Sequence, residues 1–151
     1  MIKKARLEQV RQIQSLVKYF ASKDLMLDRS LNELYENLRD FWVWSKNKKV
    51  YGCAALHMLW DGLAEIKSVA VSEKHHKENI GTKLIEQCLK EAKQLGIKRV
   101  FVLTYAPNFF KKFGFKRISK EKLPHKIWAE CINCPKFPDC NEVALIKNIA
   151  R

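Results

Sequence analysis

Residues 64–84 read AEIKSVAVSEKHHKENIGTKL, and this stretch decides the fold. Apolar residues dominate positions 64–71, which predicts a buried strand, and a polar loop follows it. From residue 80 to residue 95 apolar side chains recur every three or four positions until Gly96, which predicts an amphipathic helix that ends at a glycine. The sequence therefore predicts a strand, a loop and a helix in direct succession.

The junction between this strand and this helix predicts an anion-binding site. The first N–H groups of a helix have no partner inside the helix, and the helix dipole adds partial positive charge there. A pyrophosphate could bind these amides, with the Thr82 hydroxyl and the Lys77 and Lys83 ammonium groups as further donors. The chain has neither a Walker lysine motif nor a full G-x-G-x-x-G, which disfavours ATPase and dinucleotide-binding functions.

Helices and strands alternate outward from this stretch. Ser30 and Glu33 form a capping box at the start of one predicted helix. A chain of 151 residues suffices for one domain and is too short for two, so we expect residues 1–151 to form a single α/β domain. Periodicity and turn residues predict strands at 2–5, 41–46, 50–59, 63–71, 100–104, after Gly114 and at 142–149, with helices at 7–22, 30–40, 80–95 and 107–112.

Composition narrows the class of protein. An apolar share of 47% indicates a globular chain. No window approaches the ~20 apolar residues of a membrane span, and no apolar segment follows the N-terminus, so we expect no membrane partner and no export signal. Five cysteines in such a chain favour reduced thiols, which predicts a cytoplasmic location. The net charge of +13 is scattered along the chain, which fits solvated lysines or an anionic ligand better than nucleic acid.

At residues 76–81 the sequence resembles the GNAT superfamily of N-acetyltransferases. That family binds the coenzyme A pyrophosphate through the motif Q/R-x-x-G-x-G/A, where this chain has His76 in place of Gln or Arg and Asn79 in place of the first glycine. Asn adopts left-handed backbone angles more readily than most residues. The resemblance implies one domain with a mixed, mostly antiparallel sheet and helices on both faces. It also implies acetyl-CoA as cofactor, bound by Val69, Ala70, Val71, His76, Lys77, Asn79, Ile80, Gly81 and Thr82.

The resemblance spans residues 2–149 and becomes more specific in several motifs. They are similar to the acetyltransferase domain of short-form N-acetylglutamate synthases, which lack an amino-acid-kinase domain. This implies acetyl transfer to the α-amino group of an amino acid, L-glutamate or glutamine, at the first step of arginine biosynthesis; a homodimer stays open. The motifs are Arg29-Ser30-x-x-Glu33-Leu34, Gly52-Cys53-Ala54-Ala55-Leu56, Ala64-Glu65-Ile66, Val69-Ala70-Val71 and Phe101-Val102-Leu103-Thr104.

Acetyl transfer to an amine needs a base for the amine proton and an acid for the leaving thiolate. Glu65 is the candidate base, because burial in an apolar strand raises a carboxyl pKa and similar enzymes use a carboxylate here. A structural carboxylate, or one paired with Lys67, is the alternative. The tyrosine that GNAT enzymes often use as the acid aligns with Phe110, which we assign to the core. Tyr105 is then a candidate acid; the alternatives are that water protonates the thiolate, that no dedicated residue does so, and that Tyr105 only packs.

A dicarboxylate amino acid needs cations to bind its carboxylates. Arg29, directly before the Ser30 helix cap, is the first candidate, and Lys112 is a second from the resemblance. Solvated surface cations are the alternative for both. The resemblance places Cys53 in the substrate site, although its apolar surroundings in the sequence also fit a core residue.

The segment 125–140 contains the pattern His-x5-Cys-x2-Cys-x5-Cys. Its four soft ligands, His125, Cys131, Cys134 and Cys140, could form a tetrahedral zinc site. A substrate-covering loop with free thiols is the alternative, and no metal is our main expectation.

Two other functions remain open at this point. One is a GNAT enzyme that acts on a protein or another small amine. The other is a non-catalytic, basic nucleic-acid-binding module with a Cys/His zinc loop, for which the sequence offers no recognised nucleic-acid motif.

Overall fold

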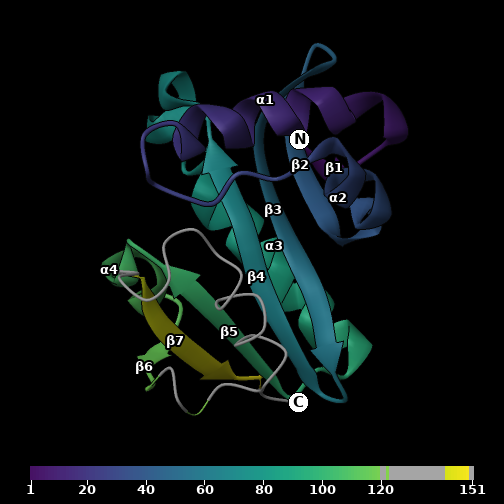
Figure 1. Cartoon of the computed structure of the whole chain (residues 1–151). Coiled ribbons are helices and arrows are strands. Elements are labelled where there is room, and N and C mark those ends of the chain that lie inside the picture. The colour runs from purple at the N-terminus through teal and green to yellow at the C-terminus, as the bar shows by residue number, and fades with distance from the viewer. Residues whose placement is uncertain (120–121, 123–141, 150–151) are drawn as a thin grey trace.

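A computed structural model describes residues 1–119, 122 and 142–149 (Figure 1). Within these residues no helix is long and apolar enough to cross a membrane. The strands are β1 Ile2–Lys4, β2 Phe41–Lys46, β3 Lys49–Trp60, β4 Leu63–Val71, β5 Arg99–Thr104, β6 Lys116–Arg117 and β7 Val143–Asn148. The helices are η1 Leu7–Gln9, α1 Val10–Ala21, α2 Leu31–Glu36, η2 Leu38–Asp40, η3 Glu73–Glu78, α3 Ile80–Leu95 and α4 Pro107–Lys111.

The strands form one sheet in the order β1-β2-β3-β4-β5-β7-β6. All neighbouring strands are antiparallel except β4 and β5, which are parallel because α3 connects them (Figure 1). The sheet is therefore mixed and mostly antiparallel, as the sequence predicts.

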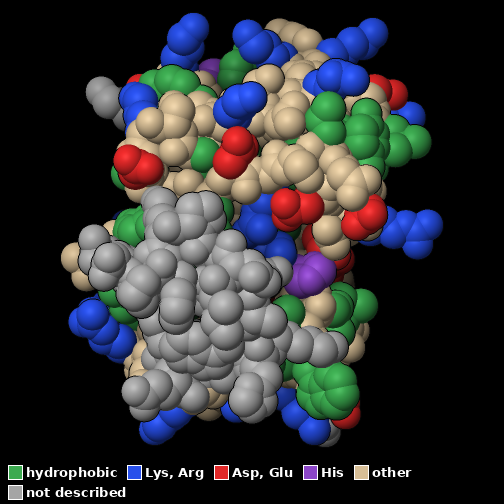
Figure 2. All heavy atoms as spheres, viewed as in Figure 1, with side chains coloured by type: hydrophobic (Ala, Val, Ile, Leu, Met, Phe, Trp, Pro, Cys, Tyr) green, Lys and Arg blue, Asp and Glu red, His purple; other side chains and the backbone are tan. Residues whose placement is uncertain are grey.

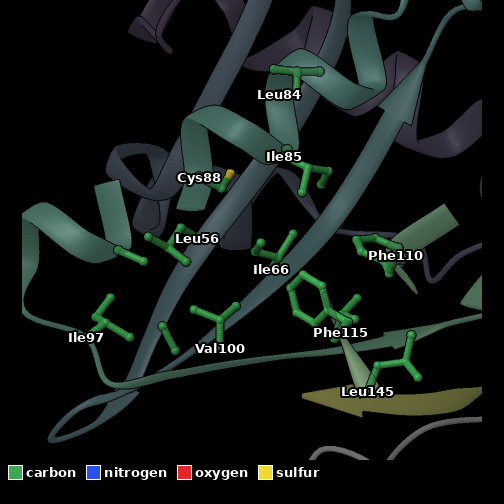
Figure 3. Close-up of a cluster of buried hydrophobic side chains, with 14 of the residues drawn as sticks. Leu56, Ile66, Leu84, Ile85, Cys88, Ile97, Val100, Phe110, Phe115 and Leu145 are labelled. Carbon is green, nitrogen blue, oxygen red and sulfur yellow. The ribbon is translucent and has the colours of Figure 1, made fainter. Parts of the chain in front are cut away.

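Helices cover both faces of this sheet. On one face α1 and α2 bury a cluster that includes Val10, Ile13, Val17 and Leu34 against β2, β3 and the end of β4. On the other face α3 and α4 pack over a second cluster, and Figure 3 shows side chains from helix and strands meeting there. The second cluster includes Leu56, Ile66, Leu84, Ile85, Cys88, Val100, Phe110 and Phe115.

The predicted elements are confirmed with small shifts at their ends, but two helices are divided: the helix expected over 7–22 begins as the short η1, and the helix expected over 30–40 is interrupted. We expected a single helix over 30–40, but the chain forms α2 and then the short η2. The break lies at Asn37, which leaves the helical region with φ −110° and ψ 20°. Its side-chain amide Nδ2 donates to the carbonyl of Glu33 over 2.9 Å, and its backbone N–H donates to the same carbonyl over 3.0 Å, so the side chain adds a second donor at the end of α2.

Candidate active site

The parallel strands β4 and β5 separate soon after they start. Their paired residues end at Glu65 and Phe101, although β5 remains paired with β7 along its whole length. A pocket of about 380 Å³ lies where the two strands diverge. Residues 65–69 line one wall, residues 102–106 line another, and the segment before α2 closes a third side.

A bulge in β4 accompanies this separation. Cys53 and Ala55 of β3 pair with Ala70 and Lys67 of β4, so β4 carries one residue more than its partner over this interval. The extra residue is Ser68, whose φ of +55° is unusual for a side chain with a Cβ. The bulge shifts the side-chain alternation, so Ala70 packs beside α1 while Val69 and Val71 pack beside α3. Bulges commonly re-aim residues next to active sites.

Glu65 lines the pocket at the last paired position of β4 and β5. Its side chain is only 6% exposed and lines the pocket. It forms an interaction within the structure, yet no ion pair joins it to Lys67 among the described residues. On β3 its cross-strand neighbour is His57, whose Nδ1 lies 2.6 Å from Asp40 Oδ2. A buried carboxylate therefore faces the cavity, with a polar pair beside it.

Tyr105 lines the pocket from the end of β5. The Thr104 hydroxyl accepts a hydrogen bond from the backbone N–H of Ala106 over 2.9 Å, which fixes the turn that carries the tyrosine. Tyr105 is half-buried and has an interaction of its own. Phe110 follows on α4, 4% exposed and in edge contact with Phe115, as predicted for a core residue (Figure 3).

Arg29 reaches the pocket from the segment before α2. Ser30 caps this helix, since its hydroxyl accepts the N–H of Glu33 over 3.1 Å. The Glu33 carboxylate turns back and lies 3.3 Å from Arg29 Nη1. Arg29 Nε is buried and has no hydrogen-bond partner, the single such side-chain atom in the part of the chain that the structure describes. An unsatisfied guanidinium donor at a pocket wall indicates an anionic ligand.

The start of α3 has the form of an anion site. Asn79 precedes the helix with φ +56° and ψ 28°, so the left-handed backbone expected there is present. Its side chain makes no capping hydrogen bond, so the first-turn amides of Ile80, Gly81 and Thr82 keep their donors for another partner. A Cβ on Gly81 would lie 3.4 Å from Phe109, a residue that also lines the pocket. Phe109 thus connects the helix start with the pocket.

His76 stabilises the loop between β4 and α3. Its Nε2 lies 2.6 Å from the carbonyl oxygen of Val71, and its ring stacks on Phe20 with centroids 6.3 Å apart. The histidine therefore bridges the end of β4 and α1. The side chain of Lys77 lies outside what the structure describes.

Two predicted substrate residues do not reach the pocket. Cys53 is fully buried in the cluster beneath α1, and its thiol donates to the carbonyl of Ser68 over 3.3 Å. Burial raises the pKa of this thiol to about 12. Lys112 is exposed just after α4, with its Nζ 5.6 Å from the ring centre of the pocket residue Phe109, and does not itself line the pocket. Cys53 is a candidate substrate residue with a core position as the alternative, and in the structure its side chain lies in the core because it faces α1.

The predicted zinc ligands His125, Cys131, Cys134 and Cys140 lie outside the described residues. Among the residues that are described, no group of three or more His, Cys, Asp or Glu could hold a metal ion.

Two residues of the pocket lining are not predicted as site residues from the sequence, because their positions depend on the separation of β4 and β5. Lys67 and Glu142 both line the pocket, and Glu142 has an interaction of its own. The signal for Lys67 was present, because residues two apart on a strand share a face and Glu65 was already assigned to the site. Glu142 offered no comparable signal.

These features combine into one arrangement. An anion site at the start of α3 is linked by the separated edge of β4 to a pocket that holds two carboxylates, a phenol and two cations. Such a site can hold a long anionic ligand and perform proton transfer at its far end.

Comparison with known proteins agrees with this arrangement. The sequence profile of the acetyltransferase (GNAT) family matches residues 7–115. An uncharacterised N-acetyltransferase of Chlorobaculum tepidum is 38% identical over 148 residues, covering 98% of this chain and 96% of that protein. An amino-acid acetyltransferase of Mycobacterium tuberculosis is 36% identical over 133 residues, covering 86% of this chain and 76% of that protein.

Solved structures show the same architecture. A Mycobacterium tuberculosis protein in complex with CoA superposes with a TM-score of 0.84 at 30% identity, and the match covers 99% of each chain. N-acetylglutamate synthase from Neisseria gonorrhoeae, in complex with coenzyme A and N-acetyl-glutamate, superposes with a TM-score of 0.91. At 24% identity, and with 35% of that chain covered, the second match supports the fold alone. Both proteins are bound to coenzyme A, the cofactor that the sequence predicts for this chain.

Proposed function

This chain belongs to the GNAT acetyltransferase family, and from that premise we propose that it transfers the acetyl group of acetyl-CoA to the α-amino group of L-glutamate or glutamine. The observation that carries the proposal is that one pocket holds both the buried Glu65 carboxylate and the unsatisfied donor of Arg29. An amine that also carries a polar or anionic group matches these two residues.

The residues present fit the cofactor. The uncapped first-turn amides of α3 are donors suited to a pyrophosphate, and Asn79 holds the left-handed backbone that precedes them. Gly81 leaves the helix start without a side chain where Phe109 packs closely. Val69, Ala70 and Val71 lie on the part of β4 that no longer pairs with β5, so their backbone forms the path to the pocket. Acetyl-CoA, when bound, supplies an acetyl group activated as a thioester.

In this proposal each pocket residue has one task. Glu65 accepts the proton from the ammonium group of the amino acid, directly or through a water, because only the neutral amine is nucleophilic. Arg29 binds a carboxylate of the amino acid through the donor that no protein group satisfies. Tyr105, at the end of β5, donates the proton that the departing thiolate takes up. The product would then enter arginine biosynthesis.

Several observations support an amino acid over other amines. The relative from Mycobacterium tuberculosis at 36% identity is named an amino-acid acetyltransferase. The net charge of +13 attracts acidic substrates and repels polyamines. On the face shown in Figure 2, basic side chains are scattered among the described residues, which does not resemble a stripe that follows a nucleic-acid backbone.

Calorimetry with acetyl-CoA, followed by a thiol-release assay with glutamate, glutamine and a panel of amines, tests the proposal. We expect micromolar binding of acetyl-CoA and thiol release on glutamate or glutamine. Release only on another amine or a protein would replace the substrate and keep the enzyme class. Absence of acetyl-CoA binding, with salt-dependent binding to duplex DNA, would replace the function altogether.

The variant Glu65→Gln tests the base. We expect turnover to fall by about 10²-fold or more with acetyl-CoA affinity retained, because removal of a general base typically costs that much. Glu86→Gln, an exposed carboxylate on α3, is the matched control and should behave as the unmodified protein. Near-normal turnover in Glu65→Gln would remove this residue from the mechanism.

A further inference from the structure

Lys67 is a second cation in the pocket for which neither the fold nor the cofactor site accounts. It lines the cavity from β4, two residues beyond Glu65 and on the same face of the strand. It is half-buried, and none of the ion pairs between described residues includes it. A partly desolvated ammonium group without a protein anion is unfavourable unless a ligand supplies the negative charge.

The surroundings leave the Lys67 side chain open to the cavity. Its cross-strand neighbour on β3 is Ala55, which is too small to cover it. The next residue, Ser68, is the bulge, which turns Val69 to the α3 face, so the next side chain on the lysine's own face of β4 is the small Ala70. The lysine therefore faces the space into which the two strands open.

We infer that Lys67 binds the α-carboxylate of the amino-acid substrate, while Arg29 binds the carboxylate or amide at the far end of its side chain. This inference rests on the proposed function. Residues two apart on a strand are about 6.6 Å apart along it. The α-amine and the α-carboxylate share one carbon atom, so a substrate whose amine faces Glu65 presents this carboxylate to the adjacent Lys67. Arg29 approaches from the segment before α2, across the pocket, and is left for the distal group.

Two acidic side chains share the pocket with Lys67. Glu65 and Glu142 line it and each has an interaction of its own, and none of the ion pairs between described residues joins either of them to the lysine. Of the charged groups in the described lining, Lys67 and Arg29 are the cations, so the pocket offers one cation for each end of a five-carbon amino acid.

Three substrates and two variants test the inference. L-glutamate has both carboxylates, its α-amide lacks the α-carboxylate, and L-glutamine lacks the distal one. Lys67→Met keeps the length of the side chain and removes its charge, and Lys46→Met removes one exposed charge at the end of β2 as the matched control. Thiol release at saturating acetyl-CoA gives kcat and KM, and calorimetry gives the acetyl-CoA affinity of each variant.

We expect Lys67→Met to raise KM for glutamate and for glutamine by about 10- to 100-fold, the usual effect of losing a charge-assisted hydrogen bond. The value of kcat should change much less, and activity on the α-amide and acetyl-CoA affinity should stay the same. Lys46→Met should leave all values unchanged.

Three outcomes would overturn the inference. A KM that rises for glutamate alone would assign Lys67 to the distal carboxylate. Equal losses on all three substrates, or no loss at all, would make the lysine structural or irrelevant. An unmodified protein that binds acetyl-CoA but acetylates none of the three compounds would overturn the proposed substrate and, with it, the role of Lys67.

Discussion

The left-handed backbone at Asn79 allows a quantitative test of the loop that precedes α3. An ordinary residue with a Cβ loses about 1–2 kcal/mol in this conformation, glycine loses almost nothing, and Asn lies between them. The Asn79 side chain makes no capping hydrogen bond, so its replacement tests the backbone alone. We expect Asn79→Ala to lower the free energy of unfolding by about 1 kcal/mol, or the melting temperature by about 2–4 °C. Asn79→Gly should stay within about 0.5 kcal/mol of the unmodified protein.

Urea unfolding and calorimetry with coenzyme A provide the two measurements. If the alanine variant relaxes toward right-handed angles, the ligand must restore the loop, and its Kd should rise by about fivefold. Asn108→Ala is the control, because Asn108 is exposed within α4 and has no left-handed angle to maintain. Unchanged unfolding and unchanged affinity in Asn79→Ala would refute the argument that this backbone angle shapes the cofactor loop.

Two further predictions concern the core. In Gly52→Ala the new Cβ would lie 2.9 Å from Ile80 and 3.1 Å from Leu84 of α3. We therefore expect urea unfolding to show a loss of about 1–3 kcal/mol in stability, and coenzyme A to bind more weakly because the start of the helix shifts. Full stability would show that α3 can move without cost. Burial raises the pKa of Cys53 and of Cys88 to about 12, so both remain protonated thiols at pH 8. Both should resist iodoacetamide in the folded protein and react with it in urea, which mass spectrometry of their peptides measures. Rapid labelling of either cysteine in the folded protein would contradict this burial.

Local pattern predicts most of the secondary structure of this chain. The apolar period of α3 and the turn residues around the strands are strong signals in the sequence. The predicted ends of these elements therefore agree with the structure to within one or two residues. The left-handed angle at Asn79 also follows from residue type, because Asn tolerates it. These features depend on residues that are close in sequence.

Features that depend on strand divergence could not be predicted. Serine has no preference that would announce the bulge at Ser68, and no glycine marks the place. Residues 53–56 are all buried, so alternation could not tell which face Cys53 occupies. The sequence shows the charge of Lys67, but whether that charge faces a pocket depends on the separation of β4 and β5, which only the tertiary structure sets.

The bulge at Ser68 divides β4 into two segments whose side-chain alternation differs by one position. The first segment directs Glu65 and Lys67 toward the pocket, and the second directs Val69 and Val71 toward the opposite core. Deletion of one residue at the junction would bring both segments into the same phase and exchange the environments of every side chain beyond it. The number of residues in this strand therefore limits how related sequences can differ as strictly as the chemistry of any single side chain does.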